Sequence, residues 1–197
     1  MMIRIPSVVL AIGLVTGVLT GCSSAPPARQ APVLDFAHSA PILLNVRVAE
    51  IDSRYQPEIA PPNIERSVTP TPQEALIKWA QQRLRSDGTE NVARFTIVEA
   101  PVTAENLSRT GGLTGALTTE PAQRWTVTLE AQLEFLDENG TRLDGFTAKV
   151  ARTRDLKEGM TSEERSLFWS EMIAAAIGEF DAQIISGLRQ YAAPWML

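Results

Sequence analysis

Apolar and polar residues alternate most regularly over residues 124–135, RWTVTLEAQLEF. Six apolar side chains share one face of this predicted strand: Trp125, Val127, Leu129, Ala131, Leu133 and Phe135. The other face carries hydroxyl, amide and carboxylate groups. One apolar and one polar face are typical of an antiparallel sheet that is covered on a single side.

A second strand is expected to pair with the first as a hairpin. Asp137-Glu138-Asn139-Gly140 after the first strand supplies a tight turn, because Asn-Gly favours the type I′ form. The return strand is predicted over residues 143–154, with Phe146, Ala148 and Val150 facing inward and a bulge near Gly145.

Two earlier segments also read as strands. Residues 42–51, ILLNVRVAEI, alternate in hydrophobicity, and residues 91–102 place Ala93, Phe95 and Ile97 on one face. Residues 55–72 between them contain five prolines. Because proline cannot donate a ladder hydrogen bond, we expect this stretch to cross the surface in extended form.

Two capping boxes predict two helices. Thr71 with Glu74 opens the first, in which apolar residues recur at helical spacing until Gly88 ends it. Thr161 with Glu164 opens a second helix that runs to about Tyr191. Its apolar stripe consists of Trp169, Met172, Ala176, Phe180, Ile184, Leu188 and Tyr191.

A stripe of small residues also runs along the second helix: Ala175, Gly178, Ala182 and Ser186. Packing of the first helix against it is the favoured interpretation, and contact with a partner is the alternative. The predicted fold is an α+β two-layer sandwich of order β-α-β-β-β-α. Its antiparallel four-stranded sheet carries two helices on one face.

The N-terminus predicts export. Arg4 precedes an apolar run, residues 8–19, of 12 residues. A membrane-spanning helix needs about 20, so the run favours a signal peptide. The next residues, Leu19-Thr20-Gly21-Cys22, resemble the lipobox that bacterial lipoprotein signal peptidase recognises. The alternative is an ordinary secretory signal in which Cys22 is incidental.

The resemblance implies that Cys22 becomes the acylated N-terminus of the mature chain, carrying diacylglycerol and a further chain such as palmitate. Two or three acyl chains anchor a protein firmly in a membrane. We therefore divide the chain into a signal peptide (1–21), a lipidated cysteine with a flexible tether (22–40) and one periplasmic domain (41–197).

Composition argues against several function classes. The net charge of −5 gives no support to nucleic-acid binding. Cys22 is the only cysteine and His38, in the tether, the only histidine, which disfavours disulfides, metal sites and a serine hydrolase. Glu130 and Glu134 are expected to be solvated charges about 14 Å apart along their strand. We expect no enzyme, no cofactor and no metal.

Two regions are candidate contact surfaces. The long connection 103–122 carries Leu113 and Leu117 near its tip, and it is either a plain loop or an element that inserts into a partner or a lipid surface. A basic group on and after the predicted strand 143–154 comprises Lys149, Arg152, Arg154 and Lys157. These side chains could bind lipid phosphates, or they could simply solvate an edge strand.

The order of these elements behind a lipobox resembles small proteobacterial outer-membrane lipoproteins. Two such groups are the LPS-assembly lipoprotein and the auxiliary lipoproteins of ABC-type lipid transporters. The segments APPNIERSVTPTPQEALIKWAQQRLRSDG and ERSLFWSEMIAAAIGEFDAQI are similar to an uncharacterised alphaproteobacterial lipoprotein family. Ser23 next to the cysteine implies sorting to the outer membrane rather than retention in the inner one.

The resemblance implies a non-catalytic lipoprotein, anchored in the outer membrane through Cys22 and facing the periplasm. It would serve with a protein partner as an accessory subunit of an envelope assembly or lipid/LPS transport machine. The alternative function is a stand-alone lipid- or glycan-binding module.

Overall fold

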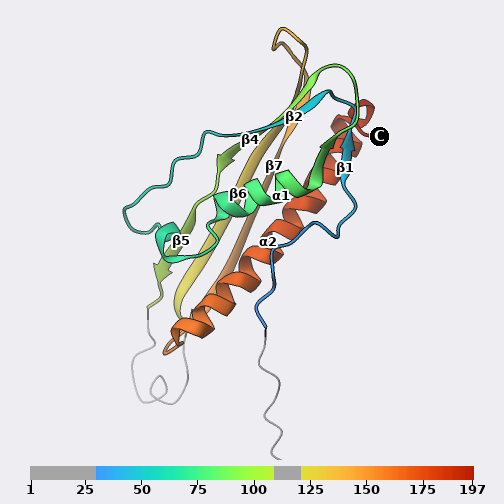
Figure 1. The fold of residues 1–197 in the computed structure, drawn as a ribbon. Coiled ribbons are helices and arrows are strands. Elements are labelled where there is room, and N and C mark those ends of the chain that lie inside the picture. The colour runs from blue at the N-terminus through green and yellow to red at the C-terminus, as the bar shows by residue number, and fades with distance from the viewer. Residues whose placement is uncertain (1–29, 109–120) are drawn as a thin grey trace, which may run out of the picture.

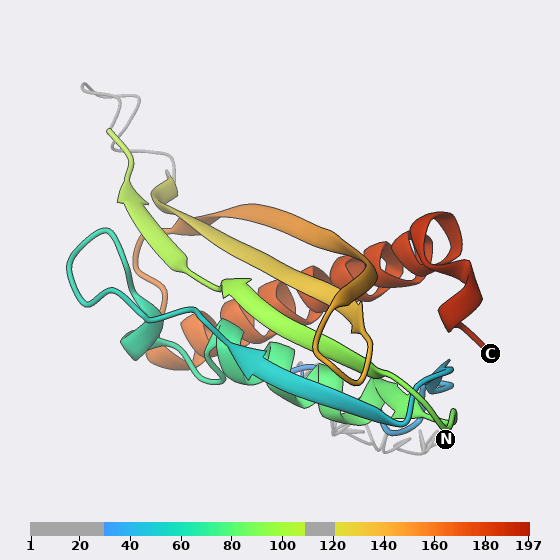
Figure 2. The ribbon, with the colours of Figure 1, turned by 90° about the horizontal axis from the view of Figure 1, so that it is seen from above.

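The two long strands and the long helix dominate the fold. The computed structural model describes residues 30–108 and 121–197. Strands β6 (Pro121–Leu136) and β7 (Arg142–Lys157) form an antiparallel pair, and α2 (Ser162–Tyr191) runs alongside them (Figure 1). Figure 2 shows the sheet in one layer and both helices in the other. The α+β class and the two-layer arrangement are therefore confirmed.

The sheet itself differs from the prediction. It has five strands in the order β2-β4-β6-β5, with β7 also paired to β6. Strands β4 and β5 both pair along one edge of β6, and β7 pairs along its other edge. Strand β2 (Val48–Ser53) pairs with β4 (Val92–Glu99) in parallel, and β5 (Val102–Asn106) and β6 are antiparallel. A separate parallel pair joins β1 (Ile42–Leu44) to β3 (Leu84–Ser86). The predicted four-stranded antiparallel sheet and its strand order are wrong.

Helix α1 explains the parallel pairs. It spans Pro72–Arg83 and lies between the first two strands and the next two in the sequence. A helical crossover returns the chain to the end from which it started, so the strands on either side run in the same direction. Gly88 does not end this helix. It instead lies against Val46, where a Cβ atom would clash with the backbone.

The β6–β7 hairpin turns differently from the expected type I′ form. Positive φ occurs at Gly140 (80°) but not at Asn139. The Asp137 carboxylate accepts hydrogen bonds from the Asn139 and Thr141 N–H groups, which fixes the loop without a type I′ pair. The strand register then shifts by one residue at Leu143, close to the predicted bulge, and leaves this side chain 50% exposed.

The hydrophobic core lies between the sheet and the helices. All six apolar side chains predicted on the inner face of β6 are at most 6% exposed, and so is the α2 stripe except Tyr191. The small-residue stripe of α2 does not pack against α1, because Gly178, Ala182 and Ser186 face solvent. Helix α1 meets α2 elsewhere, through Trp79, whose ring lies edge-on against Phe180.

The proline-rich stretch covers one edge of the sheet. Ile64 donates a backbone hydrogen bond to Val102 of β5, and Pro62 accepts one from Ala104. Glu65 of the short 3-10 helix η1 (Glu65–Ser67) is 3% exposed and accepts a 2.6 Å hydrogen bond from the Tyr55 hydroxyl. The extended crossing of the surface is thus fixed to β5 at several points.

Part of the predicted tether belongs to the packed structure. Leu34 and Phe36 pack against the core, and the Phe36 N–H donates to the Gln82 side chain of α1. His38, by contrast, has a side chain that is 94% exposed. The folded part of the chain therefore includes residues before position 41.

Candidate functional site

The junction between β7 and α2 is held by local interactions. Gly159 has a φ of 75°, which suits glycine and lets the chain reverse between the two elements. Thr161 then caps α2, because its side chain accepts from the Glu164 N–H while the Glu164 carboxylate accepts from the Thr161 N–H. The hydrogen bond from the Thr161 backbone lowers the pKa of Glu164. The start of α2 is thus fixed beside the end of β7.

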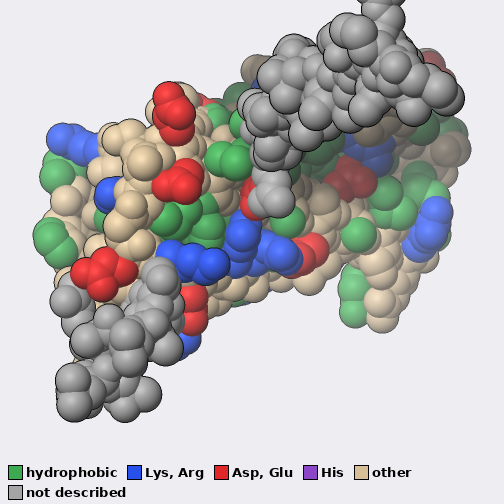
Figure 3. Space-filling model, turned by 90° about the horizontal axis from the view of Figure 1, so that it is seen from below, with side chains coloured by type: hydrophobic (Ala, Val, Ile, Leu, Met, Phe, Trp, Pro, Cys, Tyr) green, Lys and Arg blue, Asp and Glu red, His purple; other side chains and the backbone are tan. Residues whose placement is uncertain are grey.

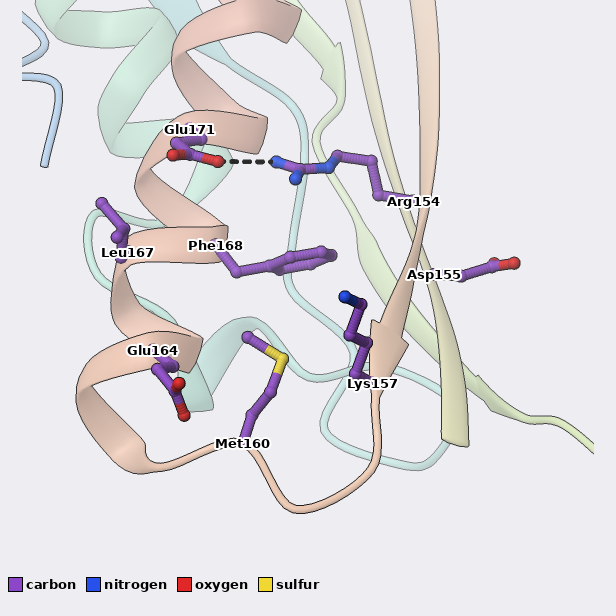
Figure 4. Close-up of a pocket in the computed structure, with 8 residues that line it drawn as sticks. All are labelled: Arg154, Asp155, Lys157, Met160, Glu164, Leu167, Phe168 and Glu171. Carbon is purple, nitrogen blue, oxygen red and sulfur yellow. Dashed lines mark hydrogen bonds and ion pairs between the residues drawn. The ribbon is translucent and has the colours of Figure 1, made fainter. Parts of the chain in front are cut away.

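A hollow of about 450 Å³ lies between these two elements. Figure 4 shows Phe168, Met160 and Lys157 pointing into it, whereas Asp155 points away. Arg154 crosses from β7 to Glu171 of α2, with 3.3 Å between Nη1 and Oε2, and its guanidinium lies 4.4 Å from the centre of the Phe168 ring. The hollow has an apolar floor and a charged rim.

Two further hollows lie near the start of α2. One of about 360 Å³ shares Lys157 and Met160 with the first hollow, and one of about 410 Å³ lies between Thr69 and the start of α2. Arg165 lines both of these, so the three hollows surround one end of the sandwich. Figure 3 views this end and shows basic and acidic side chains next to exposed apolar groups.

Most of the charged groups here already have partners. Arg124 pairs with Asp155 at 2.8 Å, which lowers the pKa of Asp155 and raises that of Arg124. Arg154 pairs with Glu171. Within residues 30–108 and 121–197, Lys157 has no ion pair. It is the cation at the hollow that can meet an incoming carboxylate.

The structure does not bring the predicted basic group together on one surface. Side chains alternate along a strand. Lys149 therefore faces the open side of the sheet, where it bonds Glu130 at 2.7 Å and Glu99 at 3.0 Å. These hydrogen bonds raise the pKa of Lys149.

Arg152 and Arg154 extend toward the opposite layer, where each pairs with a glutamate of α2. Whether any of these cations contacts a partner stays a prediction. The other predicted contact residues, Leu113 and Leu117, lie outside the described residues. So do the predicted recognition and lipidation residues: Leu19, Thr20, Gly21 and Cys22.

No metal centre is visible in the part of the chain that the structure describes. Over these residues no group of three or more His, Cys, Asp or Glu side chains is arranged to hold a metal ion. Glu130 bonds Lys149, and Glu134 lies 3.6 Å from Arg142, so both predicted surface carboxylates are in ion pairs. Among the described helices, none is both long and apolar enough to cross a bilayer.

One feature of the site was not predicted from the sequence. The Lys149 backbone N–H points away from β6 and donates to the Gln183 side chain of α2, at 3.1 Å. This bond shows that α2 reaches the outer edge of β7 at Lys149. A glutamine within an amphipathic helix gives no signal of such a contact.

Comparison with known proteins gives only distant matches. No protein-family model matches the chain, and no curated protein sequence matches it. Among solved structures, a minor lipoprotein from Acinetobacter baumannii is similar at 14% identity and a TM-score of 0.40, covering 76% of this chain and 93% of that one.

Two other solved structures match at a comparable level. The uncharacterized lipoprotein B from Nitrosomonas europaea has 14% identity and a TM-score of 0.42, with 77% and 92% of the two chains covered. The rare lipoprotein B from Shewanella oneidensis has 15% identity and a TM-score of 0.34, with 71% and 94% covered. At TM-scores below 0.5, these likenesses carry no argument about this chain.

Proposed function

We propose that this protein is a non-catalytic, lipid-anchored lipoprotein of the bacterial outer membrane that faces the periplasm. It acts through protein contacts, as an accessory subunit of an envelope assembly machine or of a lipid/LPS transport machine. The observation that carries the proposal is the tetrad Leu19-Thr20-Gly21-Cys22 directly behind a 12-residue apolar run. That run is too short to span a bilayer and has the length of a signal-peptide core.

The surface of the described residues supports a role in binding another molecule rather than in catalysis. Its acidic groups near the hollows are occupied by arginines or by a helix cap, as in the pairs Arg154–Glu171 and Arg124–Asp155. A catalytic acid or base needs a reacting group within reach and a free proton site. Surfaces with paired charges and an apolar hollow suit recognition of another molecule.

The first experiment determines the N-terminus of the mature protein. The full chain is expressed in a bacterial host with an outer membrane, and the N-terminal peptide is analysed by mass spectrometry. We expect a peptide that begins at acylated Cys22 and sediments with outer membranes. Cys22→Ala should remain an unprocessed precursor, whereas the neighbouring control Ser23→Ala should be acylated normally. A mature chain that carries a free Cys22 thiol would overturn the proposal.

A variant of Ser23 tests sorting between the inner and outer membranes. Ser23→Asp should still be acylated but should move to the inner-membrane fraction, because aspartate at this position favours retention. An unchanged distribution would remove the support that Ser23 gives to an outer-membrane location.

The accessory role is tested by cross-linking in native envelopes. We expect a defined protein to co-purify with the acylated wild type and to be lost with Cys22→Ala. Recovery of lipid or glycan alone, with no protein partner, would favour the stand-alone binding module instead.

A further inference from the structure

Strand β7 has an open outer edge. Over the described residues it pairs with β6 alone. In an antiparallel strand the backbone N–H and C=O groups of successive residues point to alternate sides. Since the Lys149 N–H points away from β6, the N–H groups of Ala151, Thr153 and Asp155 do so as well. No described residue accepts a hydrogen bond from these three.

The part of the β7 edge that is open, residues 151–155, is bounded on both sides. At Lys149 the Gln183 side chain closes the edge. At the other end, beyond Asp155, the edge leads into the 450 Å³ hollow with Phe168 and Met160 at its floor (Figure 4). About five residues of β7 are therefore available to a strand that would end at an apolar cavity.

Helix α2 leaves room beside this edge. Glu171 and Glu179 reach β7 and pair with Arg154 and Arg152. Ala175 lies midway between the two glutamates at i,i+4 spacing and so faces the same side. Ala182 and Ser186 continue this exposed line toward the C-terminus. Of the small-residue stripe, Ala175 and Gly178 thus lie next to residues 151–155, where larger side chains would obstruct a neighbouring strand.

We infer that a partner protein adds an extended strand to β7 over residues 151–155. This inference rests on the proposed accessory function. The added strand places one large apolar side chain in the hollow lined by Met160 and Phe168, and a nearby carboxylate meets Lys157. Strand addition is an established mode of peptide recognition, in which the backbone provides affinity and pockets for alternate side chains provide specificity.

Charge favours a different protein over a second copy of this chain. Strand β7 carries five basic residues, Arg142, Lys149, Arg152, Arg154 and Lys157, against two acidic ones, Asp144 and Asp155. Four of the five basic residues already have acidic partners among the described residues, and Lys157 is left without an ion pair. A second copy of β7 has no free carboxylate to offer Lys157, because Asp155 is paired with Arg124 and Asp144 accepts hydrogen bonds from Gly145 and Trp195. An acidic strand with an apolar anchor matches the edge better.

The test uses the acylated full-length chain in native envelopes. The photo-reactive amino acid p-benzoylphenylalanine replaces Thr153 at the edge or, as a control, Gln132 in the centre of the open sheet face. Ala151→Pro removes an outward N–H and places a ring in the path of a strand, yet it leaves the pairing with β6 intact because that N–H is not part of the ladder. Ala151→Thr keeps the N–H and is the matched control.

We expect position 153 to form an adduct with a protein other than this chain, and position 132 to form none. Ala151→Pro and Lys157→Glu should each reduce the adduct by about tenfold, which corresponds to roughly 1.4 kcal/mol. Ala151→Thr should leave it unchanged. Thermal unfolding of each variant shows whether the domain still folds, and Lys157→Glu provides a test even where Ala151→Pro unfolds it.

Other outcomes would overturn the inference. These are an adduct of this chain with itself, an adduct that Ala151→Pro does not reduce in a folded protein, adducts from position 132 alone, or no adduct from position 153. The proposed function fails separately, when mass spectrometry finds no acylated Cys22. A failure at the β7 edge with acylated Cys22 and a co-purifying protein partner would leave the accessory role standing.

Discussion

Asp181 of α2 binds two of the three side-chain nitrogens of Arg83 of α1, with 2.7 Å to Nε and 3.1 Å to Nη2. The same carboxylate accepts a 2.8 Å hydrogen bond from the Trp79 indole. The Arg83 side chain is only 7% exposed. Because the Arg83 guanidinium is almost fully buried and is held by Asp181 through two nitrogens, this contact joins the two helices in one arrangement.

Replacing this carboxylate should be costly. Asp181→Ala leaves a buried guanidinium and an indole N–H without an acceptor, and we expect it to lower the free energy of unfolding by about 3 kcal/mol. Urea denaturation measures the change. The matched control is Asp155→Ala, which removes an exposed pair with Arg124 and should lower the free energy of unfolding far less. Equal losses of unfolding free energy for the two variants would show that burial of Arg83 does not strengthen its contact with Asp181.

Two glycines of α2 should respond in opposite ways to the same substitution. A Cβ atom at Gly187 would overlap the Phe146 ring of β7, so Gly187→Ala should destabilise the protein by about 1–3 kcal/mol. Gly178 has no atom within 4 Å of its Cβ position. Gly178→Ala should therefore stabilise the helix by roughly 0.5–1 kcal/mol. Thermal unfolding distinguishes the two, and Phe146→Leu should partly rescue Gly187→Ala.

The hairpin loop should weaken in acid. Hydrogen bonds from the Thr141 and Asn139 N–H groups lower the pKa of Asp137 below its ordinary value of 3.8. The folded state therefore favours the ionised carboxylate. This contribution is present above pH 3.8 and is lost as the pH falls through the pKa of the folded state.

The control for this effect is Asp137→Asn, which retains an acceptor oxygen but does not titrate. We expect the stability difference between wild type and Asp137→Asn to shrink as the pH is lowered from 6 toward 2, measured by denaturation at each pH. A difference that is constant over this range would contradict the role of the Asp137 charge.

The buried Glu65 should control the titration of Tyr55. Burial and the hydrogen bond to Glu65 raise the pKa of Tyr55 above its ordinary value of 10.0. The folded state then favours the neutral phenol, so stability is lost as the pH rises above 10 toward the raised pKa. Glu65→Ala should bring that pKa back toward 10.0.

Spectrophotometric titration in a Tyr191→Phe background isolates Tyr55, since the chain has two tyrosines. Glu65→Ala also removes an acceptor from Tyr55 and from the Val102 N–H, which lies 3.4 Å from the carboxylate. We expect a loss of about 1–3 kcal/mol in the free energy of unfolding. Glu65→Gln keeps an acceptor oxygen and should lose less.

The long periodic elements could be predicted from the sequence. The alternation over residues 124–135 identified β6 and its buried face, and the capping boxes at Thr71 and Thr161 marked where both helices begin. In each case the signal is local, because burial of one face repeats at the period of the element itself.

Pairing between strands that are distant in the sequence could not be predicted from such local patterns. Nothing in residues 42–51 shows that they divide into β1 and β2, each parallel to a strand beyond α1. The basic residues of β7 are divided between two faces of the sheet for a simpler reason. Lys149 differs from Arg152 and Arg154 in parity along the strand, which places them on opposite faces of the sheet.

The segment that covers β5 also limits what can assemble on this sheet. In the half of the sheet next to the start of α2, β6 lies between β7 and β5, and residues 62–64 occupy the outer side of β5. A strand added at β7 therefore finds no equivalent site across this half of the sheet. The proposed association would therefore end after one addition at this place and give a complex of fixed stoichiometry rather than a growing fibre.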